Sequence, residues 1–274
     1  MLHVRALSDI FVLGIKEFYK GKALGNEHLY THRQKKSAYK RFWKEVIIAQ
    51  DSDGFFIELD QRPVRLPKGT RLSVPSYALA EALAEEWRVA GRGEEKTFTS
   101  ADLPLTGMTG FMVEYLSSER EAIVQSLLAY AQSDVLCYRE VSQKALHRRQ
   151  SEVWDPLLQQ LEILLGCRFI TTTGVMPITQ TNETIQIFQK ALDACTQAEL
   201  AVLGNVVPIL GSLALGFLIL QANMTAETAV DSATLDEQFQ MNLWGRETEI
   251  IHRIENMKKE VSTAIRFLTL CQKG

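Results

Sequence analysis

A run of 27 residues without a charged side chain, residues 200–226, constrains the fold of this chain more than any other segment. Its centre, residues 206–220, is almost entirely apolar, and Asn205 and Gln221 border it. A membrane-spanning helix needs about 20 mostly apolar residues, so this centre is too short to cross a bilayer. Gly211, Ser212 and Gly216 supply the small side chains that close helix packing requires. The run therefore predicts a central helix that is buried on all sides.

Apolar spacing divides the rest of the chain into an early part with strand patterns and a later part with helix patterns. Over residues 41–75, short segments rich in aromatic and β-branched residues alternate with Gly, Pro and Asp turns, which predicts a β-meander. A helix is expected next, with Ser76 as its N-cap and with Leu79, Leu83 and Trp87 on one face. From residue 103 onward the spacing is mostly helical, apart from a strand-like piece at residues 168–175.

Separate blocks of strands and helices predict an α+β fold, with a small β-rich N-terminal domain followed by a larger, mainly α-helical C-terminal domain. We place a lead-in of unassigned role at residues 1–40, the β-rich domain with one helix at 41–110, and the helical domain at 111–274. The charge distribution supports a lead-in that is distinct from the rest of the chain. Residues 1–45 carry +6, from ten Lys/Arg against four Asp/Glu, whereas the remainder carries −9.

The lead-in lacks the longer apolar region and the cleavage site of a secretory signal. Asp9 and Glu17 also fit an acid-poor transit peptide badly. These features favour the bacterial cytoplasm, with the mitochondrial matrix as the alternative. Basic and aromatic residues mix over residues 33–44, but a net charge of −3 for the whole chain argues against nucleic acid as the partner.

The cysteines show no pattern typical of a metal site or a disulfide framework. The chain has four, all expected to be reduced thiols: Cys137, Cys167, Cys195 and Cys271. We find no phosphate-binding loop, no nucleophile elbow and no zinc-protease motif, so we expect no cofactor, no metal and no catalysis. The alternative is a cysteine-dependent enzyme that uses Cys137 as nucleophile and His147 as base.

Three stretches mix aromatic and polar residues without a catalytic pattern: residues 133–139, residues 150–157, and residues 236–240 together with the segment up to Glu249. Together they are typical of a surface that holds another protein, because Trp and Tyr are favoured anchors there.

These stretches carry a resemblance to a known family. The matching pieces are RFWK at 41–44, LDQRPVRLP at 59–67, LAEALAEEW at 79–87, PLT at 104–106, YAQSDVLCYR at 130–139, RQ at 149–150, WDPL at 154–157, GVM at 174–176 and LWG at 243–245. In order and spacing they resemble the assembly chaperones that bind the unassembled alpha subunit of the F-one sector of ATP synthase, the Atp-twelve family. The resemblance covers roughly residues 40–270, and the lead-in has no counterpart in it.

The resemblance implies a non-catalytic chaperone that shields the alpha subunit from aggregation and hands it over for assembly of the hexamer. We expect a monomer without stable membrane insertion, whose acidic body binds the partner even without residues 1–35. The residues expected to face the partner are Glu237, Gln238, Phe239, Trp244 and Glu249. Structural roles are expected for Trp87 as a packing anchor, for Asp134 as a helix-end cap, and for Trp154 and Asp155.

Overall fold

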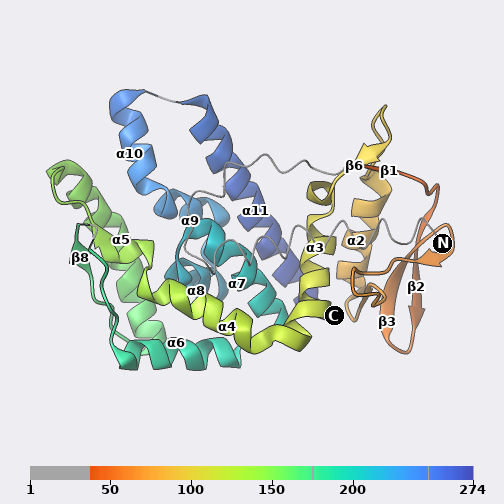
Figure 1. Ribbon diagram of the computed structural model, residues 1–274, viewed down its shortest axis with the longest axis horizontal. Coiled ribbons are helices and arrows are strands. Elements are labelled where there is room, and N and C mark those ends of the chain that lie inside the picture. Colours follow the sequence, from red (N-terminus) through yellow and green to blue (C-terminus); the bar gives the residue numbers. More distant parts are fainter. Residues whose placement is uncertain (1–37, 175, 246, 274) are drawn as a thin grey trace. The chain divides into compact units, whose positions relative to one another are not determined.

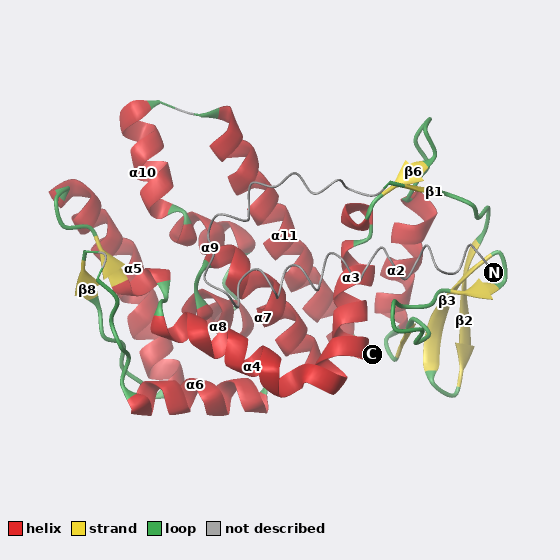
Figure 2. Ribbon diagram, viewed as in Figure 1, coloured by secondary structure: helices red, strands yellow, loops and turns green. Residues whose placement is uncertain are grey.

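The computed structural model describes residues 38–174, 176–245 and 247–273, so the predictions for residues 1–37 lie outside the described part. The chain forms two compact units, one from the residues up to Ser118 together with those from Arg266 onward, and the other from Glu119–Ile265. Figure 2 shows most strands in the first unit and an almost wholly helical second unit. This distribution confirms the predicted α+β fold, and the division at residue 110 stays a prediction.

Unit 1 combines two small antiparallel sheets with helices. Its elements are β1 (Tyr39–Lys40), β2 (Val46–Asp51), β3 (Gly54–Leu59), β4 (Arg62–Pro63), β5 (Ser73–Val74), α2 (Tyr77–Val89), β6 (Thr97–Phe98), η2 (Ser100–Asp102), α3 (Pro104–Gly110) and η3 (Phe111–Tyr115). One sheet pairs β1 with β6, and the other has four strands, β2 to β5. In the second sheet β3 is central, because β2, β4 and β5 all pair with it. The first long strand begins at Val46, five residues after the start of the predicted β-meander at residue 41.

Helix α2 forms the core of unit 1, as its periodicity predicts. Ser76 Oγ accepts the N–H of Leu79 at 3.3 Å and donates to the carbonyl of Leu270 at 2.7 Å. Leu79, Leu83 and Trp87 are all buried. The Trp87 ring packs edge-on against Trp43 with 5.2 Å between centroids. Burial of these large rings supplies much of the hydrophobic stabilisation of a small unit.

Two polar side chains join the C-terminal part of α2 to its neighbours. The guanidinium of Arg41 donates to the carbonyls of Arg88 and Ala90 at 2.8 and 2.7 Å, which satisfies orphan groups at the C-terminal end. The carboxylate of Glu86 accepts the N–H groups of Leu105 and Thr106 at 2.6 and 2.9 Å and so caps the start of α3. Burial raises the pKa of Glu86 to about 7, although these hydrogen bonds act to lower it.

Unit 2 is built from helices and one short pair of parallel strands. Its elements are α4 (Leu116–Gln132), η4 (Val135–Cys137), β7 (Tyr138–Arg139), α5 (Lys144–Leu165), β8 (Thr172–Thr173), α6 (Asn182–Ala194), α7 (Gln197–Leu210), α8 (Leu213–Ala222), α9 (Ala226–Ala233), α10 (Leu235–Trp244) and α11 (Thr248–Gln272). Helices α4 and α11 each begin in one unit and end in the other. The division in α4 coincides with a kink, since Glu119 has non-helical angles. The predicted strand at 168–175 shortens to β8.

The charge-free run forms two buried helices, so the prediction of one central helix is wrong in number and right in burial (Figure 1). Gly211 ends α7 in the left-handed region with φ of 65°, and Ser212 then caps α8 by accepting the N–H of Leu215 at 2.9 Å. A Cβ at Gly216 would lie 2.7 Å from a Val207 methyl, so glycine permits the close approach of the two helices. In the described ranges, no helix combines the length and apolarity needed to cross a membrane.

Candidate partner-binding site

Helix α10 presents most of its side chains to solvent. Only Leu235, in its first turn, is buried. At its other end Leu243 is 57% exposed and Trp244 is 82% exposed. Exposed single apolar residues are ordinary, but Trp is one of the residue types enriched among the anchors of interfaces, which makes Trp244 a candidate.

Two of the predicted partner-facing residues already have partners within unit 2. The carboxylate of Glu237 forms an ion pair with Arg253 of α11. The amide of Gln238 donates to Thr234 Oγ1 at 2.9 Å and to Asp231 Oδ1 at 3.2 Å. Both interactions hold α10 against its neighbouring helices and leave Glu237 exposed and Gln238 half-buried.

The other three predicted residues differ in their surroundings. Phe239 is half-buried, and Trp244 and Glu249 are exposed. The indole Nε1 of Trp244 donates to Gln240 Oε1 at 3.0 Å, one helical turn earlier. Helical spacing places Glu237 and Trp244 on one face of α10, and Phe239 lies on a different face. Glu249 stands in the first turn of α11, after the break at Gly245.

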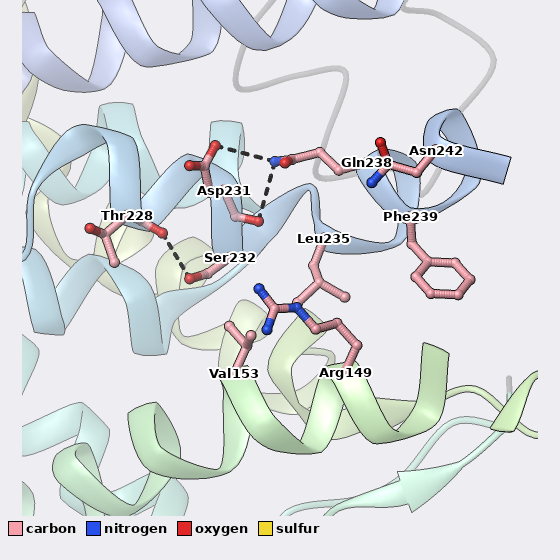
Figure 3. Close-up of a pocket in the computed structure, with 9 residues that line it drawn as sticks. All are labelled: Arg149, Val153, Thr228, Asp231, Ser232, Leu235, Gln238, Phe239 and Asn242. Carbon is pink, nitrogen blue, oxygen red and sulfur yellow. Dashed lines mark hydrogen bonds between the residues drawn. The ribbon is translucent and has the colours of Figure 1, made fainter. Parts of the chain in front are cut away.

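Phe239 belongs to a groove between α5, α9 and α10, which Figure 3 shows in close-up. The groove has a volume of about 360 Å³ and is lined by Arg149, Val153, Thr228, Asp231, Ser232, Leu235, Gln238, Phe239 and Asn242. The four α10 residues in this set are spaced i, i+3, i+4 and i+7, so they form one helical face. The sequence interpretation missed the groove because its α5 wall lies more than 80 residues away from α10.

Gln150 links α5 to α10, which are two of the three helices that line the groove. This buried side chain accepts the N–H of Glu140 at 2.6 Å and donates to Asp236 Oδ1 at 2.8 Å. Burial raises the pKa of Asp236, and the hydrogen bond from Gln150 opposes that shift. The sequence gives no signal for this bridge, since a Gln on a helix is usually exposed.

Three of the four residues predicted to be structural, Trp87, Asp134 and Trp154, are buried, whereas Asp155 is exposed. Asp134 is buried, and its two oxygens accept the N–H groups of Leu136 and Ala214 at 3.1 and 2.9 Å, which joins η4 to the start of α8. Burial raises its pKa to about 6. The indole Nε1 of Trp154 donates to the carbonyl of Ser232 at 2.9 Å, and this bond joins α5 to α9.

Asp155 and Trp87 complete that set. Asp155 pairs with Arg139 at 2.5 Å, and the Arg139 guanidinium also lies over the Trp154 ring. Trp87 is fully buried in unit 1, and its Nε1 has no hydrogen-bond partner among the described residues. An unsatisfied indole N–H is costly, so the packing of the ring must outweigh it.

The alternative enzyme site finds no support in the geometry. Cys137 is fully buried, its Sγ lies 3.6 Å from Gln180 Nε2, and burial raises the pKa of the thiol far above its ordinary value. A thiolate is the reactive form, so this environment opposes nucleophilic attack. The ring of His147 is hydrogen-bonded through Nδ1 to the carbonyl of Glu140 at 2.8 Å.

Comparison with known proteins leads to the family that the sequence motifs resemble. The profile of the family described as "ATP12 chaperone protein" matches residues 40–162. "Protein atp12, mitochondrial" of Schizosaccharomyces pombe is 26% identical over 230 residues, which is 80% of this chain and 78% of that protein. The crystal structure of Atp12 from Paracoccus denitrificans has a TM-score of 0.76 and 30% identity, covering 85% of this chain and 98% of that one. A crystal structure from Agrobacterium tumefaciens has a TM-score of 0.78 and 29% identity, covering 97% and 99%.

Proposed function

Because this chain belongs to the ATP12 chaperone family, we propose that it is a non-catalytic assembly chaperone for the F-one sector of ATP synthase. Its partner in this proposal is the unassembled alpha subunit. The observation that carries the proposal is the family match, which extends over 98% of a solved relative at 30% identity. The alpha subunit itself is named by the resemblance of the motifs at 41–44, 59–67, 130–139 and 154–157.

The proposed action is reversible shielding. A free subunit of a hexamer exposes the surface that its neighbours will cover, and an exposed apolar surface of that kind promotes aggregation. A chaperone that covers the surface must later yield to the beta subunit. An interface of moderate size suits this exchange better than the large apolar interface of an obligate complex.

We propose that the partner-facing surface includes Glu237, Gln238, Phe239, Trp244 and Glu249. Trp244 is the strongest candidate, because it is 82% exposed at the end of a helix with few buried residues. Phe239 is next, since its half-buried ring lines a groove. Glu237 and Gln238 have internal partners, so their contribution would include holding α10 in place.

The remaining proposals concern the state of the protein. We propose that it acts as a monomer, without nucleic acid and without stable membrane insertion. The bacterial cytoplasm is the proposed location, and the mitochondrial matrix is the alternative. Relatives of both kinds exist, since matches come from bacteria and from a mitochondrial protein.

Co-expression with the alpha subunit, in the absence of the beta subunit, tests the proposed function. We expect the full chain to increase the soluble fraction of the alpha subunit and to co-purify with it. Adding the beta subunit should then release the chaperone. No complex at micromolar concentration, or no change in solubility, would contradict the proposal.

A chain lacking residues 1–35 serves as the second arm of this experiment. The proposal places binding in the acidic body, so the shortened chain should rescue the alpha subunit as well as the full chain does. Loss of rescue with retained folding would assign the partner site to the lead-in instead.

A further inference from the structure

The groove between α5, α9 and α10 differs chemically from the rest of this acidic chain. Its apolar lining consists of Leu235, which is buried, and of Val153 and Phe239, which are half-buried. In Figure 3 the side chain of Arg149 leaves α5, and its guanidinium lies between Val153 and Leu235. Apolar side chains next to a cation are suited to a chain segment that carries an apolar side chain next to an anion.

The carboxylate in the groove lining and a second one nearby already have partners within unit 2. Asp231 accepts a hydrogen bond from Gln238 and forms an ion pair with Lys258 at 2.7 Å. The nearby Glu237, outside the groove, is paired with Arg253. Asp231 and Glu237 therefore each have a cationic partner within unit 2.

The cationic side chain in the groove lining, Arg149, has fewer interactions within the chain. Arg149 makes one ion pair among the described residues, a long contact of 3.8 Å with Glu152, and its side chain is 60% exposed. A guanidinium carries five N–H donors in a fixed fork that matches a carboxylate. Most of that hydrogen-bonding capacity is available to a molecule outside the chain. Of the two charged side chains in the groove lining, Asp231 already has Lys258 as its partner, so Arg149 is the charge that the groove offers to another molecule.

We propose that this groove is the docking site for an acidic, amphipathic segment of the partner protein. The segment would insert an aliphatic or aromatic side chain against Phe239, Leu235 and Val153. A neighbouring Asp or Glu of the segment would pair with Arg149. Charge complementarity at Arg149 selects such a segment, and it makes Arg149 a residue that determines specificity. This inference rests on the proposed function for the identity of the partner, the alpha subunit.

Arg148 provides a matched control for Arg149. It is the neighbouring residue on α5, it is exposed, and it lies outside the groove lining. Arg149→Glu and Arg148→Glu change the net charge equally, so any difference between them reports position and not overall charge. Since both side chains are exposed, thermal unfolding of the two variants should match that of the unmodified chain.

The test is the affinity of each full-length chain for the unassembled alpha subunit, measured at low and at physiological salt. We expect Arg149→Glu to bind at least about tenfold more weakly, and Arg148→Glu to stay within about twofold, because a charge at the interface is worth far more than one beside it. The loss on Arg149→Glu should shrink as salt rises, since screening weakens the pair that it removes. Equal affinities for the two variants would overturn the inference and leave the proposed function standing.

A second probe separates failure of the inference from failure of the proposed function. Short overlapping peptides that cover the alpha subunit are tested for binding to the full chain, each beside a copy with Asp and Glu replaced by Asn and Gln. Binding of acidic amphipathic peptides that is lost with Phe239→Ser and with the amide copies supports the groove, whether or not the intact subunit binds. Preference for basic peptides, or Arg149-dependent binding of a single-stranded oligonucleotide in their place, would overturn it.

Discussion

Helices α8 and α10 are both ten residues long and belong to the same unit, yet they use their apolar residues in opposite ways. Helix α8 buries every residue from Leu213 to Ile219, and its neighbour α7 is buried almost as completely. Helix α10 buries only Leu235 and leaves its Leu and Trp at the far end in solvent. Packing explains the composition of α8. Helix α10 carries apolar side chains that the described part of the chain does not cover, and this exposure is the basis for the proposal that they bind the partner.

The largest expected effect is a loss of stability caused by a substitution in the buried helix α8. A Cβ at Gly216 would meet side-chain atoms of Val207 at 2.7 Å and of Leu203 at 2.9 Å. Gly216→Val should therefore separate α8 from α7 and lower the free energy of unfolding by roughly 3 kcal/mol. Urea unfolding measures the change.

Gly93 is the control for this substitution, because a Cβ there would meet nothing within 4 Å. Gly93→Val should change the free energy of unfolding by no more than about 0.5 kcal/mol. Equal effects at the two glycines would show that α7 and α8 tolerate a wider spacing than the structure gives them.

A smaller effect should come from pH through Asp134, the buried cap that joins η4 to α8. Its folded pKa is raised by burial to about 6, above the ordinary value near 3.8. The folded state therefore binds the proton more tightly than the unfolded state does. The stabilisation is fully present below the unfolded pKa and is lost as pH rises through 6, at up to about 1.4 kcal/mol per pH unit.

Comparison with Asp134→Asn isolates this contribution. Urea unfolding of the unmodified chain and of the variant should be measured between pH 4 and 7.5. The variant has no titrating group at this position, so its free energy of unfolding should fall less steeply with rising pH. Parallel pH profiles would mean that Asp134 has the same pKa in both states.

The smallest expected effect on stability is at the exposed end of α10. Trp244 is 82% exposed and makes one hydrogen bond, to Gln240 in the same helix. Trp244→Ala should change the free energy of unfolding by less than about 0.5 kcal/mol, as surface substitutions usually do. A loss as large as that of Gly216→Val would show that Trp244 supports the fold and that the contrast between the two helices is wrong.

Elements with local signals were predicted well from sequence. The limits of α2 follow from Ser76 and from the four-residue spacing of Leu79, Leu83 and Trp87, and the structure has the same helix. The burial of most of residues 200–219 follows from composition alone. The break into two helices was harder to predict, because Gly211 within an apolar run permits either close packing or a left-handed turn. Tertiary context decides between the two.

Only part of the candidate site could be predicted from the sequence, because contacts between residues far apart in the chain form the rest. The sequence indicates α10 as an unusual surface through its mixture of Phe, Trp and acidic residues. It gives no sign that Arg149 and Val153 form the opposite wall, or that Gln150 bridges to Asp236 across 86 positions. Such pairs have no local periodicity, so a single sequence cannot place them together.

The central claim is that the uncovered side chains of α10 bind the partner, and the most direct measurement is the dissociation constant for the unassembled alpha subunit with and without Trp244. Isothermal titration of the full chain and of Trp244→Ala gives both values under the same conditions. The account predicts that the variant binds at least about tenfold more weakly with unchanged thermal stability, as expected for an aromatic anchor. An unchanged dissociation constant would contradict it.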